Sequence, residues 1–163
     1  MTRPKKGVAL QNQKGGYAMF THILLATDGS ELSRIAIQKG IQLAKAIHAR
    51  VTGVYVTPEV RYYTYETEIP AEVKEKTAQQ YHAVSKKYLA VVETMAKEAG
   101  VACDTVAEIN DQPHEVIIAV AEARKCDLVV MASHGRRGVK GLLLGSETQK
   151  VLTHSKIPVL VIR

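Results

Sequence analysis

The chain has 163 residues, of which 46% are hydrophobic and 23% charged, and its formal net charge is +6 at pH 7. This length and composition are typical of one globular domain and exclude a disordered or collagen-like chain. The longest apolar runs, 128–132 and 157–162, are the size of strands. They fall far short of the roughly 18 residues that a membrane span needs, so no transmembrane segment is predicted.

The positive charge is concentrated at the N-terminus. Residues 1–19 carry four basic side chains and no acidic one: Arg3, Lys5, Lys6 and Lys14. The rest of the chain has 18 basic and 16 acidic side chains, a balance too even for binding a nucleic-acid backbone. We predict that residues 1–19 are a basic flexible extension, or lie upstream of a start at Met19. Residues 20–163 are expected to form the folded domain.

Cysteine and histidine usage argues against disulfides and metal sites. Cys103 and Cys126 lack C-x-x-C spacing, and no secretory signal peptide precedes them. We expect both to be reduced, buried thiols in a cytoplasmic protein. The six histidines are scattered over different predicted elements without metal-ligand spacing, so they are not expected to form a ligand set.

From residue 20 onward, apolar runs of strand length alternate with apolar residues at helical spacing. Strands are predicted at 22–26, 51–56, 101–109, 127–132 and 158–162. Helices are predicted at 30–48, 71–99, 113–124 and 146–154. Strands that alternate with helices form a parallel sheet covered on both faces, with right-handed crossovers. We therefore predict an α/β fold with a single doubly wound, five-stranded parallel sheet.

The long helix at 71–99 shows a regular apolar spacing and a clear end. Gly100 is a natural C-terminal stop for it, and Pro113 suits the first turn of the helix that follows the third strand. The face predicted to be buried consists of Tyr81, Val84, Tyr88, Val92, Met95 and Ala99.

In an open α/β sheet, ligands bind beyond the carboxyl ends of the strands, where the strand order reverses. Segments 26–28, 56–57, 110–111 and 132–146 follow strands in this way. The last contains four glycines and three basic residues before Ser146 opens a helix: Gly135, Arg136, Arg137, Gly138, Lys140, Gly141 and Gly145. Glycines let backbone N–H groups approach a ligand, and a helix N-terminus attracts phosphate. The pattern indicates a phosphate-binding loop.

Two features of this segment support a different interpretation. Glu147 places a carboxylate at the helix start, where it competes with phosphate for the same field. Ser146-Glu147-Thr148-Gln149 also fits the capping-box pattern S-x-x-Q, so that Ser146 would only cap the helix. Asp28 has a comparable alternative role as an Asx turn or cap before Ser30, and this role is compatible with ligand binding.

Four separated segments resemble the universal stress protein family in their order and position: Thr27-Asp28-Gly29-Ser30-Glu31, Met131-Ala132-Ser133-His134-Gly135, Leu143-Leu144-Gly145-Ser146 and Pro158-Val159-Leu160-Val161. The resemblance covers residues 20–163. It implies a Rossmann-like fold of the adenine nucleotide alpha hydrolase type and a homodimer formed through the last strand, 158–162. It also implies ATP or AMP binding at the pattern G-x2-G-x9-G-[ST]. Here Ala132 replaces the first glycine of that pattern, while Gly135, Gly145 and Ser146 match it.

The resemblance also implies roles for individual residues. Asp28 would contact the ribose hydroxyls, or a magnesium ion bound with ATP, and Ala26 and the backbone of Val56 would flank the adenine. The nucleoside floor and the phosphate cradle would be formed by the two later segments: Met131, Ala132 and Gly135 for the floor, and Gly145, Ser146 and Thr148 for the phosphates. The remaining members of the predicted site are Thr27, His134, Arg137, Gly138 and Glu147. For His134, a single backbone hydrogen bond within the loop is the alternative to ligand contact.

Three functions remain open at this point. The favoured one is a stress-response regulatory homodimer that binds ATP or AMP. The alternative is a nucleotide-free dimeric interaction protein in which Ala132 marks a lost site. Slow ATP hydrolysis is the least favoured, because the sequence shows no full Walker motif and no nucleophile–base pair. Asp28 and Asp111 follow neighbouring strands and would be the carboxylates available to magnesium.

Overall fold

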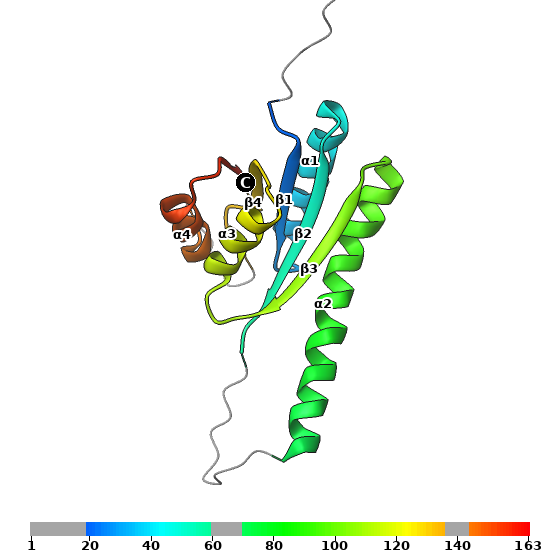
Figure 1. The fold of residues 1–163 in the computed structure, drawn as a ribbon, viewed down its shortest axis with the longest axis vertical. Coiled ribbons are helices and arrows are strands. Elements are labelled where there is room, and N and C mark those ends of the chain that lie inside the picture. The colour runs from blue at the N-terminus through cyan, green and yellow to red at the C-terminus, as the bar shows by residue number, and fades with distance from the viewer. Residues whose placement is uncertain (1–18, 60–69, 136–143) are drawn as a thin grey trace, which may run out of the picture.

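In the computed structural model, residues 19–59, 70–135 and 144–163 are described. They form one parallel five-stranded sheet with the strand order β3-β2-β1-β4-β5 (Figure 1). The strands are β1 (His22–Thr27), β2 (Arg50–Thr57), β3 (Cys103–Ile109), β4 (Leu128–Ala132) and β5 (Val159–Ile162). The helices are α1 (Glu31–Ile47), α2 (Ala71–Ala99), α3 (Pro113–Ala123) and α4 (Ser146–His154). The predicted fold class and element order are confirmed, while the predicted N-terminal extension lies outside the described residues except for Met19.

The strands β3, β4 and β5 begin one or two residues later than the sequence pattern predicts, and local hydrogen bonds explain the later start of β3 and β4. Val101 donates its N–H to the carbonyl of Ala96 at 2.9 Å, so it closes the C-terminal turn of α2 instead of opening β3. Asp127 precedes β4 because its carboxylate is turned back to β1, where it accepts hydrogen bonds from Thr21 and from the N–H of His22.

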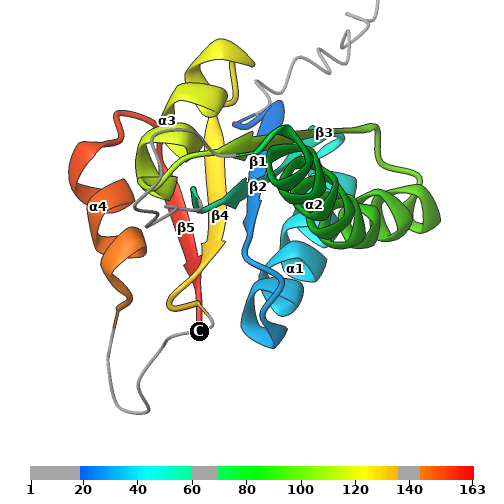
Figure 2. The same ribbon diagram turned by 90° about the horizontal axis from the view of Figure 1, so that it is seen from below.

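The central strand β1 is buried along its whole length and divides the core into two layers. Ile23 and Leu25 pack with the residues of α1 and α2, whereas Leu24 and Ala26 pack with those of α3 and α4. Figure 2 shows the two pairs of helices on opposite faces of the sheet. This alternation is the period-2 pattern of a strand that is buried on both faces.

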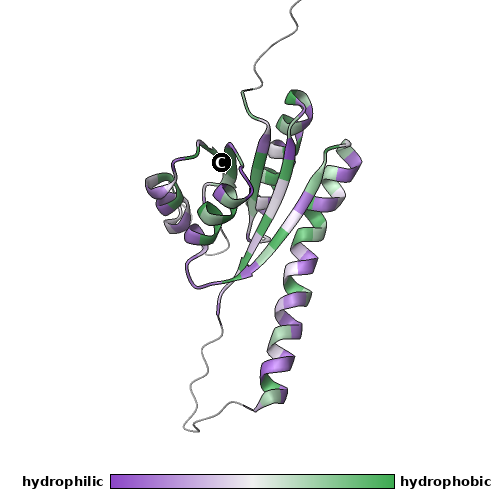
Figure 3. Cartoon of the chain, viewed as in Figure 1, coloured by the Kyte–Doolittle hydropathy of each residue, from purple (hydrophilic) through white to green (hydrophobic). Residues whose placement is uncertain are grey.

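The buried face of α2 is displaced from the predicted one. Its buried residues are Ser85, Leu89, Val92 and Ala96, and Val84, predicted to be buried, is 39% exposed. The N-terminal part of α2 extends beyond the ends of the strands, and polar residues dominate it (Figures 1 and 3). Although α2 has 29 residues, none of the helices in the described ranges is both long and apolar enough to cross a membrane.

The two cysteines are free, but only Cys126 is buried as predicted. Cys103 is half-buried because it lies on β3, which is an edge strand with one side open to solvent. Burial raises the pKa of each thiol to about 11. Both thiols are therefore protonated at neutral pH and unreactive as nucleophiles.

A polar chain, buried at one end and exposed at the other, joins three strands to the C-cap residue of α3 at the amino ends of the strands. His22 Nε2 lies 2.7 Å from the hydroxyl of Thr52, which donates to Asp104 Oδ1 at 2.5 Å, and Arg124 donates to Asp104 Oδ2 at 2.6 Å. Because the proton of Thr52 goes to Asp104, His22 must donate from Nε2. Its Nδ1 is buried and has no hydrogen-bond partner among the described residues.

This environment makes the stability of the fold depend on the protonation of His22 at acidic pH. Burial, and next the positive charge of Arg50, lower the pKa of His22 below 6.5, against weaker opposing effects of the Arg124 backbone and of the Asp104 and Asp127 carboxylates. In the window between the lowered folded pKa and 6.5, the unfolded chain binds more protons than the folded one. The stabilising contribution of neutral His22 is therefore complete above this window and is lost as the pH falls through it.

We predict that His22→Gln flattens the pH dependence of stability below neutral pH. Glutamine keeps an N–H for Thr52 but does not titrate, so the free energy of unfolding should fall less between neutral and mildly acidic pH than in the wild type. Urea unfolding across this range measures the difference. His82→Gln, at an exposed position, is the control and should follow the wild-type curve. Parallel curves for His22→Gln and wild type would contradict the assignment.

Candidate functional site

The strand order reverses at the carboxyl ends of β1 and β4. The chain runs outward from β1 to β2 and β3 on one side and to β4 and β5 on the other. Leu24 and Leu25 of β1 pair with Val129 and Val130 of β4, so these two neighbours are the point at which the strand order reverses. The predicted segments 26–28 and 132–135 both emerge here, as expected for a ligand site of this architecture.

The turn from β1 into α1 is held by side-chain hydrogen bonds. Ser30 donates its N–H to Asp28 Oδ1 at 3.0 Å, and Gly29 donates its N–H to the hydroxyl of Thr27 at 3.1 Å. Ser30 caps α1 by accepting from the N–H of Ser33. Gly29 has a φ of 76°, which favours glycine at this position. The Asx-turn role predicted for Asp28 is confirmed.

Asp28 and Gly135 are in direct contact although they lie far apart in the chain. A Cβ atom added at Gly135 would collide with Asp28 Oδ2. The absence of a side chain at 135 therefore lets the loop after β4 approach the carboxylate. Oδ2 of Asp28 faces the loop after β4, while Oδ1 accepts the hydrogen bond that holds the turn into α1.

Ser133 connects the end of β4 to three other parts of the site. It donates its N–H to the carbonyl of Ile162 at 2.7 Å and accepts the N–H of Gly145, also at 2.7 Å. Its hydroxyl lies 3.1 Å from His134 Nδ1, so among the described residues the ring of His134 contacts a side chain. Ser133 is 2% exposed. The site predicted from the sequence did not include Ser133, because its backbone partners, Ile162 and Gly145, are remote in the chain. The only sequence signal was its position between Ala132 and His134.

Among the described residues, no side chain caps the N-terminus of α4. Gly145, not Ser146, is the N-cap residue, and Ser146 is the exposed first residue of the helix. The capping-box interpretation of Ser146 is therefore wrong. The first N–H groups of a helix have no partner within the helix, so without a cap they are available to an anion. A Cβ atom at Gly145 would lie 3.2 Å from the Cα of His134, which shows how closely the two segments approach.

The end of β4 also fixes α4 through Thr148. The hydroxyl of Thr148 donates to the carbonyl of Ala132 at 3.0 Å, and the side chain is 3% exposed. This hydroxyl is therefore occupied in docking α4. Ala132 is buried in strand geometry, and the non-glycine residues with positive φ in the described ranges are His48 and Lys125. Alanine at 132 therefore needs no backbone conformation reserved for glycine.

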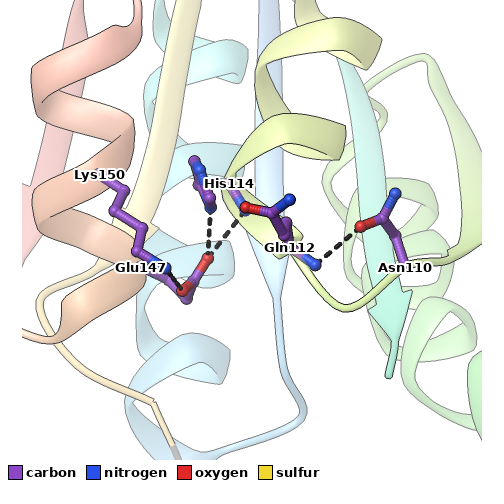
Figure 4. A network of polar contacts seen from close by, with 5 residues as sticks. All are labelled: Asn110, Gln112, His114, Glu147 and Lys150. Atoms are coloured by element: carbon purple, nitrogen blue, oxygen red, sulfur yellow. Dashed lines mark hydrogen bonds and ion pairs between the residues drawn. The ribbon is translucent and has the colours of Figure 1, made fainter. Parts of the chain in front are cut away.

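Glu147 turns its carboxylate away from the start of its own helix and toward α3 (Figure 4). Its Oε2 accepts from the N–H of His114 at 2.9 Å and from the ring Nδ1 at 3.0 Å, and its Oε1 accepts from Lys150 at 3.0 Å. Partial burial raises the pKa of Glu147, but the hydrogen bonds from Lys150 and His114 outweigh this effect and hold the pKa below its usual value. Sequence reasoning counted His114 only among the scattered histidines.

The remaining predicted residues have the following places. Ala26, Thr27 and Met131 are buried in β1 and β4, and Val56 is half-buried near the end of β2. Arg137 and Gly138 lie outside the described residues. Asp111 accepts the N–H of Glu59 at 3.0 Å. It follows β3, which β2 separates from β1, so the prediction that Asp28 and Asp111 follow neighbouring strands is wrong. Within the described ranges, no group of three or more His, Cys, Asp or Glu side chains could hold a metal ion.

The carboxyl ends of β1 and β4 thus combine two kinds of polar group. A carboxylate lies at the end of β1, and an uncapped helix N-terminus lies beyond the end of β4. Carboxylate oxygens accept hydrogen bonds from hydroxyl groups, whereas helix N–H groups bind anions. The arrangement suits a ligand that presents hydroxyls to one group and a phosphate to the other.

Comparison with a family model identifies the chain. The model of the universal stress protein family matches residues 19–163. The chain belongs to this family. It is 31% identical to universal stress protein MJ0531 of Methanocaldococcus jannaschii over 151 residues, which cover 92% of this chain and 86% of that protein. It is 30% identical to YxiE of Bacillus subtilis over 149 residues, covering 89% and 100% of the two chains.

Solved structures of universal stress proteins share the fold. The structure of MJ0577 has a TM-score of 0.68 at 28% identity and covers 88% of this chain and 96% of its own. A universal stress protein in complex with cAMP has a TM-score of 0.63 at 22% identity, with coverage of 89% and 98%. One from Archaeoglobus fulgidus in complex with dAMP has a TM-score of 0.60 at 15% identity, with coverage of 89% and 99%.

We predict that Gly135→Ala destabilises this universal stress protein only while Asp28 is present. The new Cβ displaces the carboxylate and breaks its bond to the N–H of Ser30, at a cost of about 1 kcal/mol. In an Asp28→Ala background the same substitution should have no such cost. Urea unfolding of the two single variants and the double variant gives the coupling energy between the two positions. Simple additivity would show that the two residues do not interact.

Proposed function

We propose that this universal stress protein binds an adenine nucleotide beyond the carboxyl ends of β1 and β4 and acts as a regulatory homodimer in a stress response. The observation that carries the nucleotide proposal is the uncapped N-terminus of α4, which Gly145 fixes beside the end of β4. Asp28 at the end of β1 supplies the complementary carboxylate. The cAMP and dAMP complexes of structurally similar family members support an adenine nucleotide as the ligand.

The proposed binding mode follows from the positions of Asp28 at the end of β1 and of the first turn of α4. Asp28 accepts hydrogen bonds from the ribose hydroxyls, and Ala26 and the backbone of Val56 flank the adenine. Met131 and Ala132 lie under the nucleoside. The phosphate receives the N–H groups of the first turn of α4, which belong to Ser146, Glu147 and Thr148. With ATP, a magnesium ion would be held by phosphate oxygens and a single protein carboxylate, that of Asp28, a ligand set that Mg²⁺ accepts when it keeps several waters.

The first experiment identifies the ligand. Purified protein is denatured, and any released nucleotide is identified by mass spectrometry, after which ATP and AMP are titrated into the nucleotide-free protein. A stoichiometric adenine nucleotide would support the proposal. If no nucleotide is released and neither ATP nor AMP binds, the proposal is wrong, and the alternative of a nucleotide-free interaction protein takes its place.

We predict that Ser146→Glu lowers nucleotide affinity without weakening the fold. A carboxylate in the first turn is favourable for the helix dipole, by about 0.3–1 kcal/mol, but it repels a phosphate at the same N–H groups. We expect the Kd for AMP to rise at least about tenfold, measured by calorimetric titration. Thr153→Glu introduces the same charge in the last turn of α4 and is the control, with an unchanged Kd. Equal AMP affinities in the wild type and both variants would show that the phosphate does not bind at the N-terminus of α4.

The dimer proposal rests on the exposed edge of the sheet. β5 is an edge strand of apolar residues, and Leu160 is 38% exposed. An open apolar edge invites pairing with another strand, and a two-fold axis would let β5 pair with its own copy. Such pairing would cover the β5 edge of both protomers at once.

We predict that Leu160→Lys converts the dimer into a monomer, because a lysine on each of the two facing strands introduces charge repulsion and charge opposes edge pairing. Sedimentation equilibrium of wild type and variant measures the change in mass. Leu152→Lys makes the same substitution at an exposed position of α4 and should leave the dimer intact. A wild-type protein that stays monomeric at all concentrations would rule out the dimer.

A further inference from the structure

Glu147 caps a helix to which it does not belong. The N-cap residue of α3, Gln112, provides no side-chain cap, and the N–H of His114 in the first turn donates instead to Glu147 Oε2, 33 residues away in the chain. Figure 4 shows the carboxylate of α4 at the N-terminus of α3. This contact links the starts of the two helices at the carboxyl edge of the sheet.

The same carboxylate is a potential occupant of the proposed phosphate position. Glu147 is the second residue of α4 and therefore lies in the first turn, among the N–H groups that would bind phosphate. The positive end of the helix dipole attracts a carboxylate at this position. If its side chain turned toward these N–H groups, it would satisfy them in place of a phosphate.

His114 is the main restraint on this movement. Its ring is nearly buried, and both its backbone N–H and Nδ1 contact the same oxygen, Oε2. Because a carboxylate oxygen only accepts, Nδ1 must carry the proton. Lys150 holds Oε1 from one turn along α4. The other titratable groups nearby are the ring of His154, whose centroid is 6.1 Å from that of His114, and the exposed Glu115.

We propose that Glu147 is a built-in competitor of the nucleotide phosphate, and that His114 is the positioning residue that keeps it on α3 and the start of α4 open. The inference rests on the proposed nucleotide site. It accounts for a carboxylate at the start of a phosphate-binding helix, which would otherwise oppose binding. It also makes nucleotide affinity depend on a residue that need not touch the ligand.

Two substitutions of Glu147 separate the effect of its charge from the effect of its side-chain length. Glu147→Asp keeps the charge but is one methylene too short to reach His114, so the released carboxylate should raise the Kd for AMP about threefold to tenfold. Glu147→Gln keeps the length and removes the charge, so the Kd should equal that of the wild type or fall. The Kd for adenosine, which has no phosphate, should be unchanged in both variants. Calorimetric titration with AMP and adenosine measures all four values.

A rescue experiment tests the role of His114. His114→Ala removes one of the two donors to Oε2 and should weaken AMP binding, and adding Glu147→Gln should restore it even though the double variant is less stable. Glu115→Gln and Glu115→Asp change an exposed carboxylate in the first turn of α3 and serve as controls with wild-type affinity. A purely structural contact would instead make the double variant the weakest binder.

The outcomes distinguish the two proposals. If wild type binds AMP but Glu147→Asp and Glu147→Gln have the same affinity, or if the double variant is not rescued, the inference about Glu147 is overturned and the nucleotide site stands. If wild type binds neither AMP nor ATP, the nucleotide site fails, and the inference fails with it.

Discussion

The site depends on one hydrogen bond, donated by the N–H of Gly145 to the carbonyl of Ser133 at 2.7 Å. It fixes the residue at which α4 begins, and it does so at the end of β4, beside the central strand. The N–H of Ser133 is in turn donated to Ile162 of β5. A rigid sheet edge thus holds the helix N-terminus in place, and a preorganised set of N–H groups binds an anion without the cost of ordering them.

The two ends of the sheet differ in their polar chemistry. At the amino ends, His22, Thr52, Asp104 and Arg124 form a chain that ties strands to a helix terminus, and its carboxylate is already paired with a cation. At the carboxyl ends, the helix N-termini converge and attract negative charge. There a single carboxylate, that of Glu147, joins α3 to α4. The first end contributes to stability, and the second carries the site that we propose for an anionic ligand.

Local patterns predicted most of the fold correctly. Alternating apolar runs predicted every strand, and Gly100 and Pro113 marked helix ends where the structure has them. The two errors in burial have different causes. Val84 directly precedes the buried Ser85 and lies beside the buried face of α2, so the apolar spacing placed that face slightly wrongly. Cys103 lies on the edge strand β3, where a neighbouring strand covers only one side.

By itself, the sequence determined the α/β class, the order of the elements and the glycine and aspartate positions of the site, because these depend on short-range patterns in the chain. Only the tertiary structure decided which residue caps α4, how closely Gly135 approaches Asp28, and that Glu147 binds His114 of another helix. The pattern S-x-x-Q favoured a local cap at Ser146. In the structure Gly145 is the N-cap residue instead, because its N–H donates to the carbonyl of Ser133. No local sequence pattern relates these two segments.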